Sequence, residues 1–128
     1  MPSIQKTVLV VEDEKILRDS LKTFLSKAGF TVLEAEDGEV GLKQAFEHKP
    51  DLILLDIMMP KKDGLSVLKD LRQDPWGENV PVIMLTVLEP DDEITQKISE
   101  YKPSYYLVKA NWRLEDVTSK VKEILDAS

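Results

Sequence analysis

The chain has 128 residues and a formal net charge of −7, with no cysteine and a single histidine. This length suits one domain with its own hydrophobic core. The lack of cysteine excludes disulfides and thiolate metal sites, and the acidic balance argues against direct binding to nucleic acid. No apolar run approaches the roughly 20 residues of a membrane span. The first residues, MPSIQK, lead directly into a short apolar stretch, so we expect no signal peptide. We therefore expect a cytoplasmic protein that does not insert into a membrane.

The first half of the chain alternates short apolar runs with longer amphipathic segments. The run TVLVV is continuous and β-branched, which is typical of a strand buried on both faces. In the amphipathic segment that follows, apolar residues recur on one helical face, and Gly29 stands where a helix would end. Asp37 can cap the next helix. We expect a strand at 7–11, a helix at 15–28, a strand at 31–33, a helix at 38–48 and a strand at 52–55.

The second half continues the alternation. Asp63 can cap a helix that stops before the Asp74-Pro75 pair, and Pro103 ends the helix after it. Pro81 is tolerable near the start of a strand. Apolar side chains mark the three helices: Leu65, Leu68 and Leu71 in the first, Ile94, Ile98 and Tyr101 in the second, and Leu114, Val117, Val121, Ile124 and Leu125 in the third. The strands between them are expected at 80–86 and 105–108.

Five alternations of strand and helix predict an α/β fold. Strands buried on both faces form a parallel sheet covered by helices on both sides, with right-handed crossovers. We find no linker or internal repeat, so a single domain is expected to fill residues 1–128.

Polar side chains follow four of the five predicted strands. Ligands of such sheets bind beyond the carboxyl ends of the strands, so these side chains should lie close together. They are Glu12, Asp13 and Glu14 after the first strand, Asp56 after the third, Thr86 after the fourth and Lys109 after the fifth.

This set of side chains is suited to phosphoryl chemistry. Clustered carboxylates repel one another, and a divalent cation with oxygen ligands, Mg²⁺ or Mn²⁺, relieves that repulsion. Lys109 can neutralise phosphoryl oxygens and Thr86 can donate a hydrogen bond to them. Asp56 can then act as the nucleophile that accepts the phosphoryl group.

The chain resembles the receiver domain of two-component response regulators. The resemblance covers about residues 6–125 and rests on the acidic pair in VVEDE, the segment LLDIMMPKKDG, Thr86, and the lysine of YLVKA. It implies the flavodoxin-like strand order 2-1-3-4-5, of which chemotaxis receivers are an example. It also implies a signalling switch, which catalyses only its own Mg²⁺-dependent phosphotransfer and dephosphorylation, rather than an enzyme.

The resemblance further implies roles for individual residues. Asp56 would take the phosphoryl group from a histidine kinase or a histidine phosphotransfer protein. Asp13 and Asp56 would bind Mg²⁺ directly together with the backbone carbonyl of Met58, and Glu12 would act through a metal-bound water. Thr86 and Tyr106 would form the switch, and the fourth helix, fifth strand and fifth helix would contact a downstream protein.

One departure from the family pattern affects the loop beside the lysine. Ala110 follows Lys109 where receivers usually have a cis proline. A cis bond before a residue other than proline costs about 3 to 4 kcal/mol. The sequence leaves open whether this peptide bond is cis or trans.

Two other functions have a weaker basis. A phosphohydrolase of the haloacid dehalogenase type usually has a second aspartate two residues after its nucleophile, where this chain has Met58. A flavin-binding module needs a loop rich in hydroxyl groups and glycine after the first strand, whereas the acids at 12–14 would repel a phosphate group.

Overall fold

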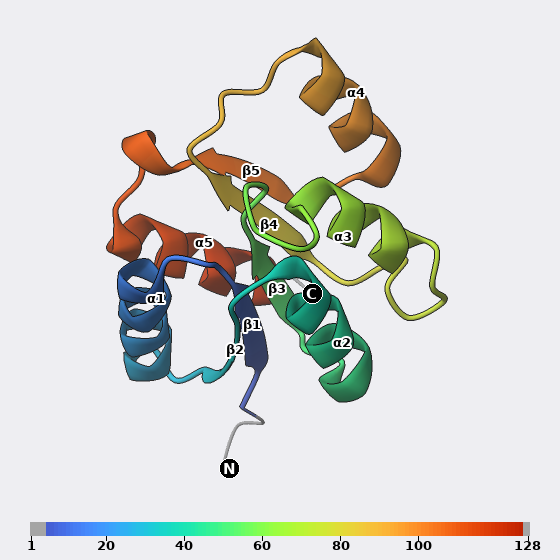
Figure 1. Cartoon of the computed structure of the whole chain (residues 1–128). Helices are drawn as coiled ribbons and strands as arrows, with labels where there is room; N and C mark the ends of the chain where they lie inside the picture. The colour runs from blue at the N-terminus through green and yellow to red at the C-terminus, as the bar shows by residue number, and fades with distance from the viewer. Residues whose placement is uncertain (1–4, 127–128) are drawn as a thin grey trace.

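Strands and helices alternate along the chain in the computed structural model (Figure 1), which describes residues 5–126. The strands are β1 (Thr7–Val11), β2 (Thr31–Ala35), β3 (Leu52–Leu55), β4 (Val82–Thr86) and β5 (Tyr105–Val108). The helices are α1 (Lys15–Lys27), α2 (Gly38–His48), α3 (Gly64–Arg72), α4 (Asp92–Tyr101) and α5 (Leu114–Asp126), with a short 3₁₀ turn, η1, at Lys109–Asn111. None of the helices within residues 5–126 is long and apolar enough to cross a membrane. The outermost residues of the predicted domain, 1–4 and 127–128, lie outside the described part of the chain.

The five strands form one parallel sheet in the order β2-β1-β3-β4-β5. β1 lies between β2 and β3, so that Val8 pairs with Val32 on one side and with Leu52 on the other. The predicted fold class and strand order are therefore confirmed. Because all strands run in the same direction, their carboxyl ends meet at one edge of the sheet.

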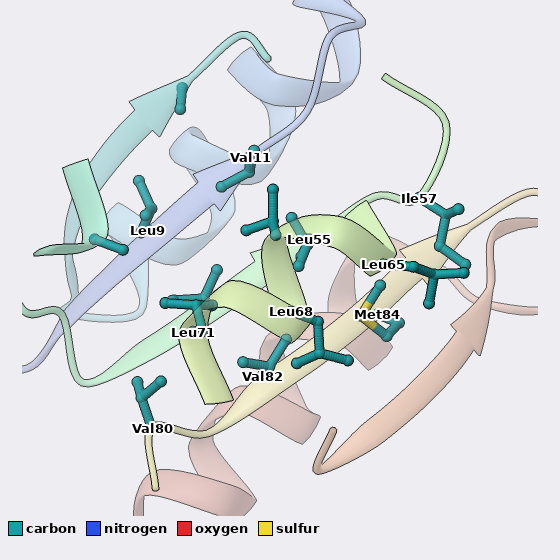
Figure 2. Packing of buried hydrophobic residues seen from close by; sticks show 14 of the residues in the cluster. Leu9, Val11, Leu55, Ile57, Leu65, Leu68, Leu71, Val80, Val82 and Met84 are labelled. Carbon is teal, nitrogen blue, oxygen red and sulfur yellow. The ribbon is translucent and has the colours of Figure 1, made fainter. Parts of the chain in front are cut away.

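Two hydrophobic layers, one on each face of the sheet, form the core. Successive residues of a strand point to opposite faces, so Val8 and Val10 enter one layer and Leu9 and Val11 the other. Helices α1 and α5 cover the first layer (Figure 1). The second is covered by α2, α3 and α4, and the side chains of α3 in this layer are shown in Figure 2. Burial on both faces explains why β1, β3 and β4 contain almost no polar residues.

The predicted helix ends are largely confirmed. The Asp37 side chain accepts a hydrogen bond from the Val40 N–H at 2.8 Å, and Asp63 accepts one from Ser66 at 2.9 Å. Gly29 has a φ of 100°, the left-handed conformation that glycine adopts readily after a helix.

Two strand boundaries differ from those predicted. β4 begins at Val82 rather than at residue 80, because Pro81 has no N–H and the Val80 carbonyl accepts a hydrogen bond from the Arg72 side chain. β2 extends to Ala35, beyond the predicted residue 33, because the whole of β1 pairs with it. The peptide bond between Lys109 and Ala110, which the sequence left open, is trans.

Candidate functional site

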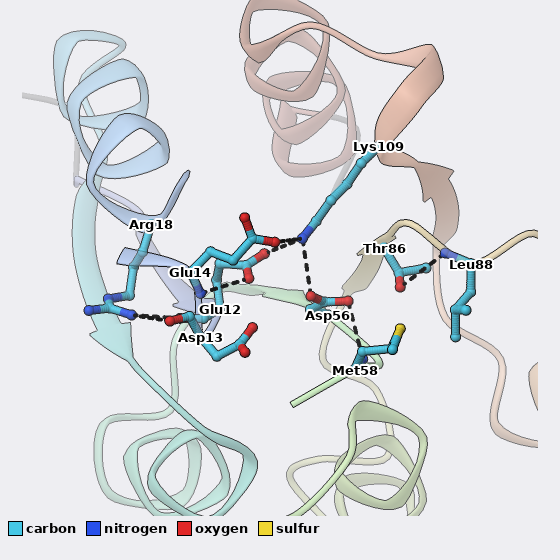
Figure 3. A network of polar contacts seen from close by, with 9 residues as sticks. All are labelled: Glu12, Asp13, Glu14, Arg18, Asp56, Met58, Thr86, Leu88 and Lys109. Carbon is cyan, nitrogen blue, oxygen red and sulfur yellow. Dashed lines mark hydrogen bonds and ion pairs between the residues drawn. The ribbon is translucent and has the colours of Figure 1, made fainter. Parts of the chain in front are cut away.

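Side chains from three strand ends meet at the carboxyl edge of the sheet (Figure 3). Glu12 and Asp13 follow β1, Asp56 follows β3 and Lys109 follows β5. Glu12, Asp13 and Asp56 each place one carboxylate oxygen within 4.8 Å of those of the other two. The predicted acidic cluster therefore forms, with Lys109 beside it.

Asp56 lies at the centre of this cluster and is only 4% exposed. Its N–H donates to the Val11 carbonyl at 3.2 Å, which ties the end of β3 to that of β1. One carboxylate oxygen accepts a long hydrogen bond from the Met58 N–H at 3.3 Å, and the other accepts from Lys109 at 3.1 Å. The orientation of the Asp56 carboxylate is therefore fixed by the Met58 N–H on one side and by the Lys109 ammonium on the other.

Lys109 connects three carboxylates. Its Nζ lies 2.7 Å from Glu12, 3.1 Å from Asp56 and 3.5 Å from Glu14. Burial alone would lower the pKa of Lys109, but the hydrogen bond to Glu12 and the charge of Asp56 outweigh it, so the pKa is raised. Lys109 is therefore a permanent cation at this edge of the sheet.

Glu12 is the most deeply buried of the acids, at 2% exposure. One of its oxygens accepts from Lys109 and the other from the Glu14 N–H at 3.1 Å. Burial raises the pKa of Glu12 to about 7, although the hydrogen bonds from Lys109 and Glu14 act in the opposite direction. Negative charge at this position is costly, and a divalent cation nearby would lower that cost.

The donor set fits a hard divalent cation. Three carboxylates offer oxygen ligands within 4.8 Å of one another, and Mg²⁺ prefers a small number of such ligands with water completing its shell. Asp13 is exposed, so a cation bound there would be open to solvent and to a phosphoryl group. The part assigned to the Met58 carbonyl remains a prediction, since the contact the structure gives Met58 in this cluster is through its N–H.

Thr86 and Tyr106 lie beside the cluster and meet at a third residue, Leu88. The buried Thr86 hydroxyl accepts a long hydrogen bond from the Leu88 N–H at 3.4 Å. The Tyr106 hydroxyl donates to the Leu88 carbonyl at 2.7 Å. In residues 5–126, Thr86 makes no hydrogen bond to Asp56. The predicted hydrogen bond from its hydroxyl to a phosphoryl group concerns the phosphorylated domain and remains a prediction.

Two contributors escaped the sequence analysis. The first is Gly64, because a Cβ at that position would overlap the carbonyl oxygen of Asp56. Arg18 donates from Nη1 to the carbonyl oxygens of Glu12 at 2.8 Å and Asp13 at 3.4 Å (Figure 3). The only sequence signal for Arg18 was a basic residue one helical turn after three consecutive acids.

Comparison with known proteins places this geometry in a family. The sequence pattern of the response regulator receiver domain matches residues 8–122. The chain belongs to this family. It is a receiver domain of two-component signalling, a phosphorylation-activated switch and not a classical enzyme.

Relatives with known names agree with this assignment. The chain is 39% identical over 126 residues to the alkaline phosphatase synthesis transcriptional regulatory protein PhoP of Bacillus subtilis (strain 168), covering 98% of the chain and 50% of the relative. It is 35% identical over 120 residues to the DNA-binding dual master transcriptional regulator RpaA of Synechocystis sp. (strain ATCC 27184 / PCC 6803 / Kazusa), covering 92% and 48%. This receiver chain thus spans about half the length of these curated relatives.

Solved structures show the same fold. A response regulator from Chloroflexus aurantiacus J-10-fl superposes with a TM-score of 0.84 at 30% identity, covering 96% of this chain and 99% of that one. The chemotaxis protein CheY4 of Vibrio cholerae gives a TM-score of 0.84 at 28% identity, covering 94% and 98%.

Proposed function

We propose that Asp56 is the phosphoacceptor of this receiver domain. The observation that carries the proposal is the position of its carboxylate, buried between an acidic pair and the Lys109 ammonium at the open edge of the sheet. A nucleophile held by hydrogen bonds on both sides approaches an incoming group in a fixed orientation.

The proposed reaction transfers one phosphoryl group. A carboxylate oxygen of Asp56 forms a bond to phosphorus while the phosphorus–nitrogen bond of the donor's phosphohistidine breaks. The donor imidazole keeps the electron pair of the broken bond and takes up a proton from solvent. Lys109 stabilises the charge on the phosphoryl oxygens, and the Thr86 hydroxyl exchanges its contact with Leu88 for one to the phosphoryl group.

We propose Mg²⁺ as the cofactor, with Mn²⁺ as a substitute. Asp13 and Asp56 would bind it with the Met58 carbonyl, and Glu12 would act through water. Bound there, the cation would supply positive charge that draws the phosphoryl oxygens toward Asp56. Support comes from the oxygen donor set and the raised pKa of buried Glu12, since burial and repulsion both favour a compensating cation.

Receiver domains of response regulators work with histidine kinases, and we propose a histidine kinase or a histidine phosphotransfer protein as the donor here. The domain would also catalyse its own Mg²⁺-dependent dephosphorylation. We further propose that residues 1–128 form one receiver domain in the cytoplasm. Its net charge of −7 supports output through protein contacts rather than direct contact with nucleic acid.

The output surface is proposed to consist of α4, β5 and α5. Tyr105 of β5 is exposed there, and Lys120 of α5 lies over its ring, with Nζ 3.9 Å from the ring centroid. β5 also connects this surface to the site, because it carries Tyr106 and leads into Lys109.

Phosphorylation by a small donor tests the proposed acceptor. Intact-mass measurement after incubation with acetyl phosphate and Mg²⁺ should show one added phosphoryl group. The signal should disappear in Asp56→Asn and in the presence of EDTA. As a matched control, Asp51→Asn removes an aspartate at the opposite end of β3 and should leave the signal in place. A full signal in Asp56→Asn, or one that EDTA does not change, would contradict the proposal.

A further inference from the structure

The turn between β1 and α1 concentrates acidic charge. Glu12, Asp13 and Glu14 are consecutive, and α1 begins directly after them with no side-chain cap at its N-terminus. Repulsion between three neighbouring carboxylates favours any backbone conformation that spreads them apart. Holding Asp13 beside Asp56 therefore needs interactions that fix the backbone of this turn.

The Arg18 side chain provides such an interaction. Its Nη1 donates to the Glu12 carbonyl at 2.8 Å and, more weakly, to the Asp13 carbonyl at 3.4 Å. On the strand side, the Glu12 N–H donates to the Ala35 carbonyl at 3.0 Å. The N–H and the carbonyl of Glu12 are therefore both held by hydrogen bonds. Of these two contacts, only the one from Arg18 also extends to the Asp13 carbonyl. Figure 3 shows the guanidinium on the far side of the turn from Lys109.

The environment of Arg18 is acidic on its other side as well. Arg18 lines a surface hollow of about 220 Å³ together with Glu34 and Glu36, and one Glu34 oxygen is buried without a hydrogen-bond partner in residues 5–126. Two acidic residues thus line the same hollow as Arg18, and the hydrogen bonds that its guanidinium makes within residues 5–126 go to the two carbonyls. Hydrogen bonds from a charged donor are roughly twice as strong as neutral ones.

We propose that Arg18 is a positioning residue for the divalent-cation site. It acts through the backbone of the acidic turn, fixing the direction in which Asp13 leaves the chain, and touches neither the cation nor the phosphoryl group. The inference rests on the Mg²⁺ site proposed above. Groups one step behind metal ligands commonly change metal affinity by about 10- to 100-fold when removed.

The test is a Mg²⁺ titration of three variants, followed by NMR amide shifts of residues 12–14 and 56–58. Arg18→Gln keeps a hydrogen-bond donor but loses the charge and the forked head, and its Mg²⁺ dissociation constant should rise about tenfold. Arg18→Lys keeps the charge and should recover part of the affinity. Lys22→Gln removes an exposed cation from the same helix and should bind like wild type.

Phosphorylation rates with acetyl phosphate separate positioning from a general defect. The Arg18→Gln rate should fall at limiting Mg²⁺ and return to the wild-type value at saturating Mg²⁺. Wild-type affinity in Arg18→Gln, an equal loss in Lys22→Gln, or a rate deficit that persists at saturation would each overturn the inference. If Arg18→Gln does not fold, Arg18→Lys gives the same comparison, and wild-type affinity there with an unshifted Asp13 amide overturns it. Failure of wild type to bind Mg²⁺ would instead refute the proposed function, and this inference with it.

Discussion

Tyr106 and Thr86 are joined through a single residue, Leu88. The Tyr106 hydroxyl donates to the Leu88 carbonyl at 2.7 Å, and the Leu88 N–H donates to the Thr86 hydroxyl at 3.4 Å. The short bond lies on the β5 side and the long one on the site side. A ligand that attracts the Thr86 hydroxyl therefore breaks the weaker contact first and frees one peptide group of Leu88.

Beryllofluoride mimics the phosphoryl group, and the conformational change that it causes at Asp56 should extend through this connection. We expect it to shift NMR amide signals throughout residues 88–114, because the two conformations differ in their contacts at Leu88 and the ligand selects one of them. In Tyr106→Phe the shifts around Asp56 should remain, while those of β5 should shrink. Shifts confined to the neighbourhood of Asp56 in wild type would show that the switch does not use this route.

Tyr106 should also make the free energy of unfolding decrease at alkaline pH. Burial, with smaller effects from the charges of Asp56, Asp91 and Glu89, raises the pKa of Tyr106 from 10.0 to about 12. Since the folded state favours the protonated hydroxyl, its contribution to stability is complete below pH 10 and declines as the pH rises toward about 12.

Urea unfolding across that pH range measures this effect. Tyr106→Phe should lose about 1 kcal/mol at neutral pH through the missing hydrogen bond, and its stability should fall less steeply above pH 10. Tyr105→Phe, on the exposed neighbour, is the control and should keep the wild-type slope. Parallel curves for wild type and Tyr106→Phe would refute the prediction.

The phosphorylated form should be long-lived. Met58 and Leu88 follow Asp56 and Thr86 at the same spacing, and the N–H of each bonds to the residue two before it. Neither side chain can orient an attacking water by a strong hydrogen bond. Changing Met58 to Asn and Leu88 to Glu together should accelerate dephosphorylation about tenfold, which corresponds to roughly 1.4 kcal/mol of barrier.

The decay of phosphorylated protein with Mg²⁺, after removal of the donor, measures this rate. Ile16→Asn changes an exposed apolar side chain on α1 to a polar one and should decay like wild type. Decay of wild type within seconds, or no acceleration in the double variant, would exclude the explanation.

Arg72 should contribute strongly to stability. Its side chain donates to the carbonyls of Gly77 at 2.7 Å, Val80 at 2.8 Å, Tyr101 at 2.8 Å and Lys102 at 3.0 Å. The last two are at the carboxyl end of α4, where a cation is favourable. A lysine cannot reach four acceptors with one ammonium, so Arg72→Lys should lower the free energy of unfolding by about 2 to 3 kcal/mol.

Chemical denaturation of Arg72→Lys and of the exposed control Arg113→Lys tests this prediction. The control should differ from wild type by less than about 0.5 kcal/mol. If the two variants are equally stable, the four hydrogen bonds of Arg72 do not contribute measurably to the stability of the domain.

The sheet was predictable because its signal is local. Short apolar runs separated by amphipathic segments allow a parallel sheet with two covered faces, and parallel strands bring their carboxyl ends to one edge. That rule alone predicted that Asp13, Asp56 and Lys109 would lie together. The strand order was predicted from the family resemblance, because the hydrophobic pattern of a strand does not indicate which other strand it pairs with.

The remaining features depend on contacts between distant segments. The start of β4 was predicted two residues early because the Val80 carbonyl is taken by Arg72, a side chain on the preceding helix. Gly64 resembles any turn glycine until the carbonyl of Asp56 is placed against it. Likewise, the use of both Glu12 oxygens follows from the positions of Lys109 and Glu14 in space.

The two tryptophans lie in different surroundings. Trp112 lines a mainly apolar hollow of about 120 Å³ together with Lys109, whereas Trp76 packs edge-on against Phe46 with ring centroids 6.2 Å apart. Indole emission depends on the polarity and charge around the ring. Because Lys109 lines the same hollow as Trp112 and its ammonium also contacts Asp56 at 3.1 Å, we expect a ligand bound at Asp56 to change the fluorescence of Trp112 and to leave that of Trp76 unchanged. The domain would then carry its own optical reporter, and a Trp76→Phe variant, in which Trp112 is the single tryptophan, tests this expectation.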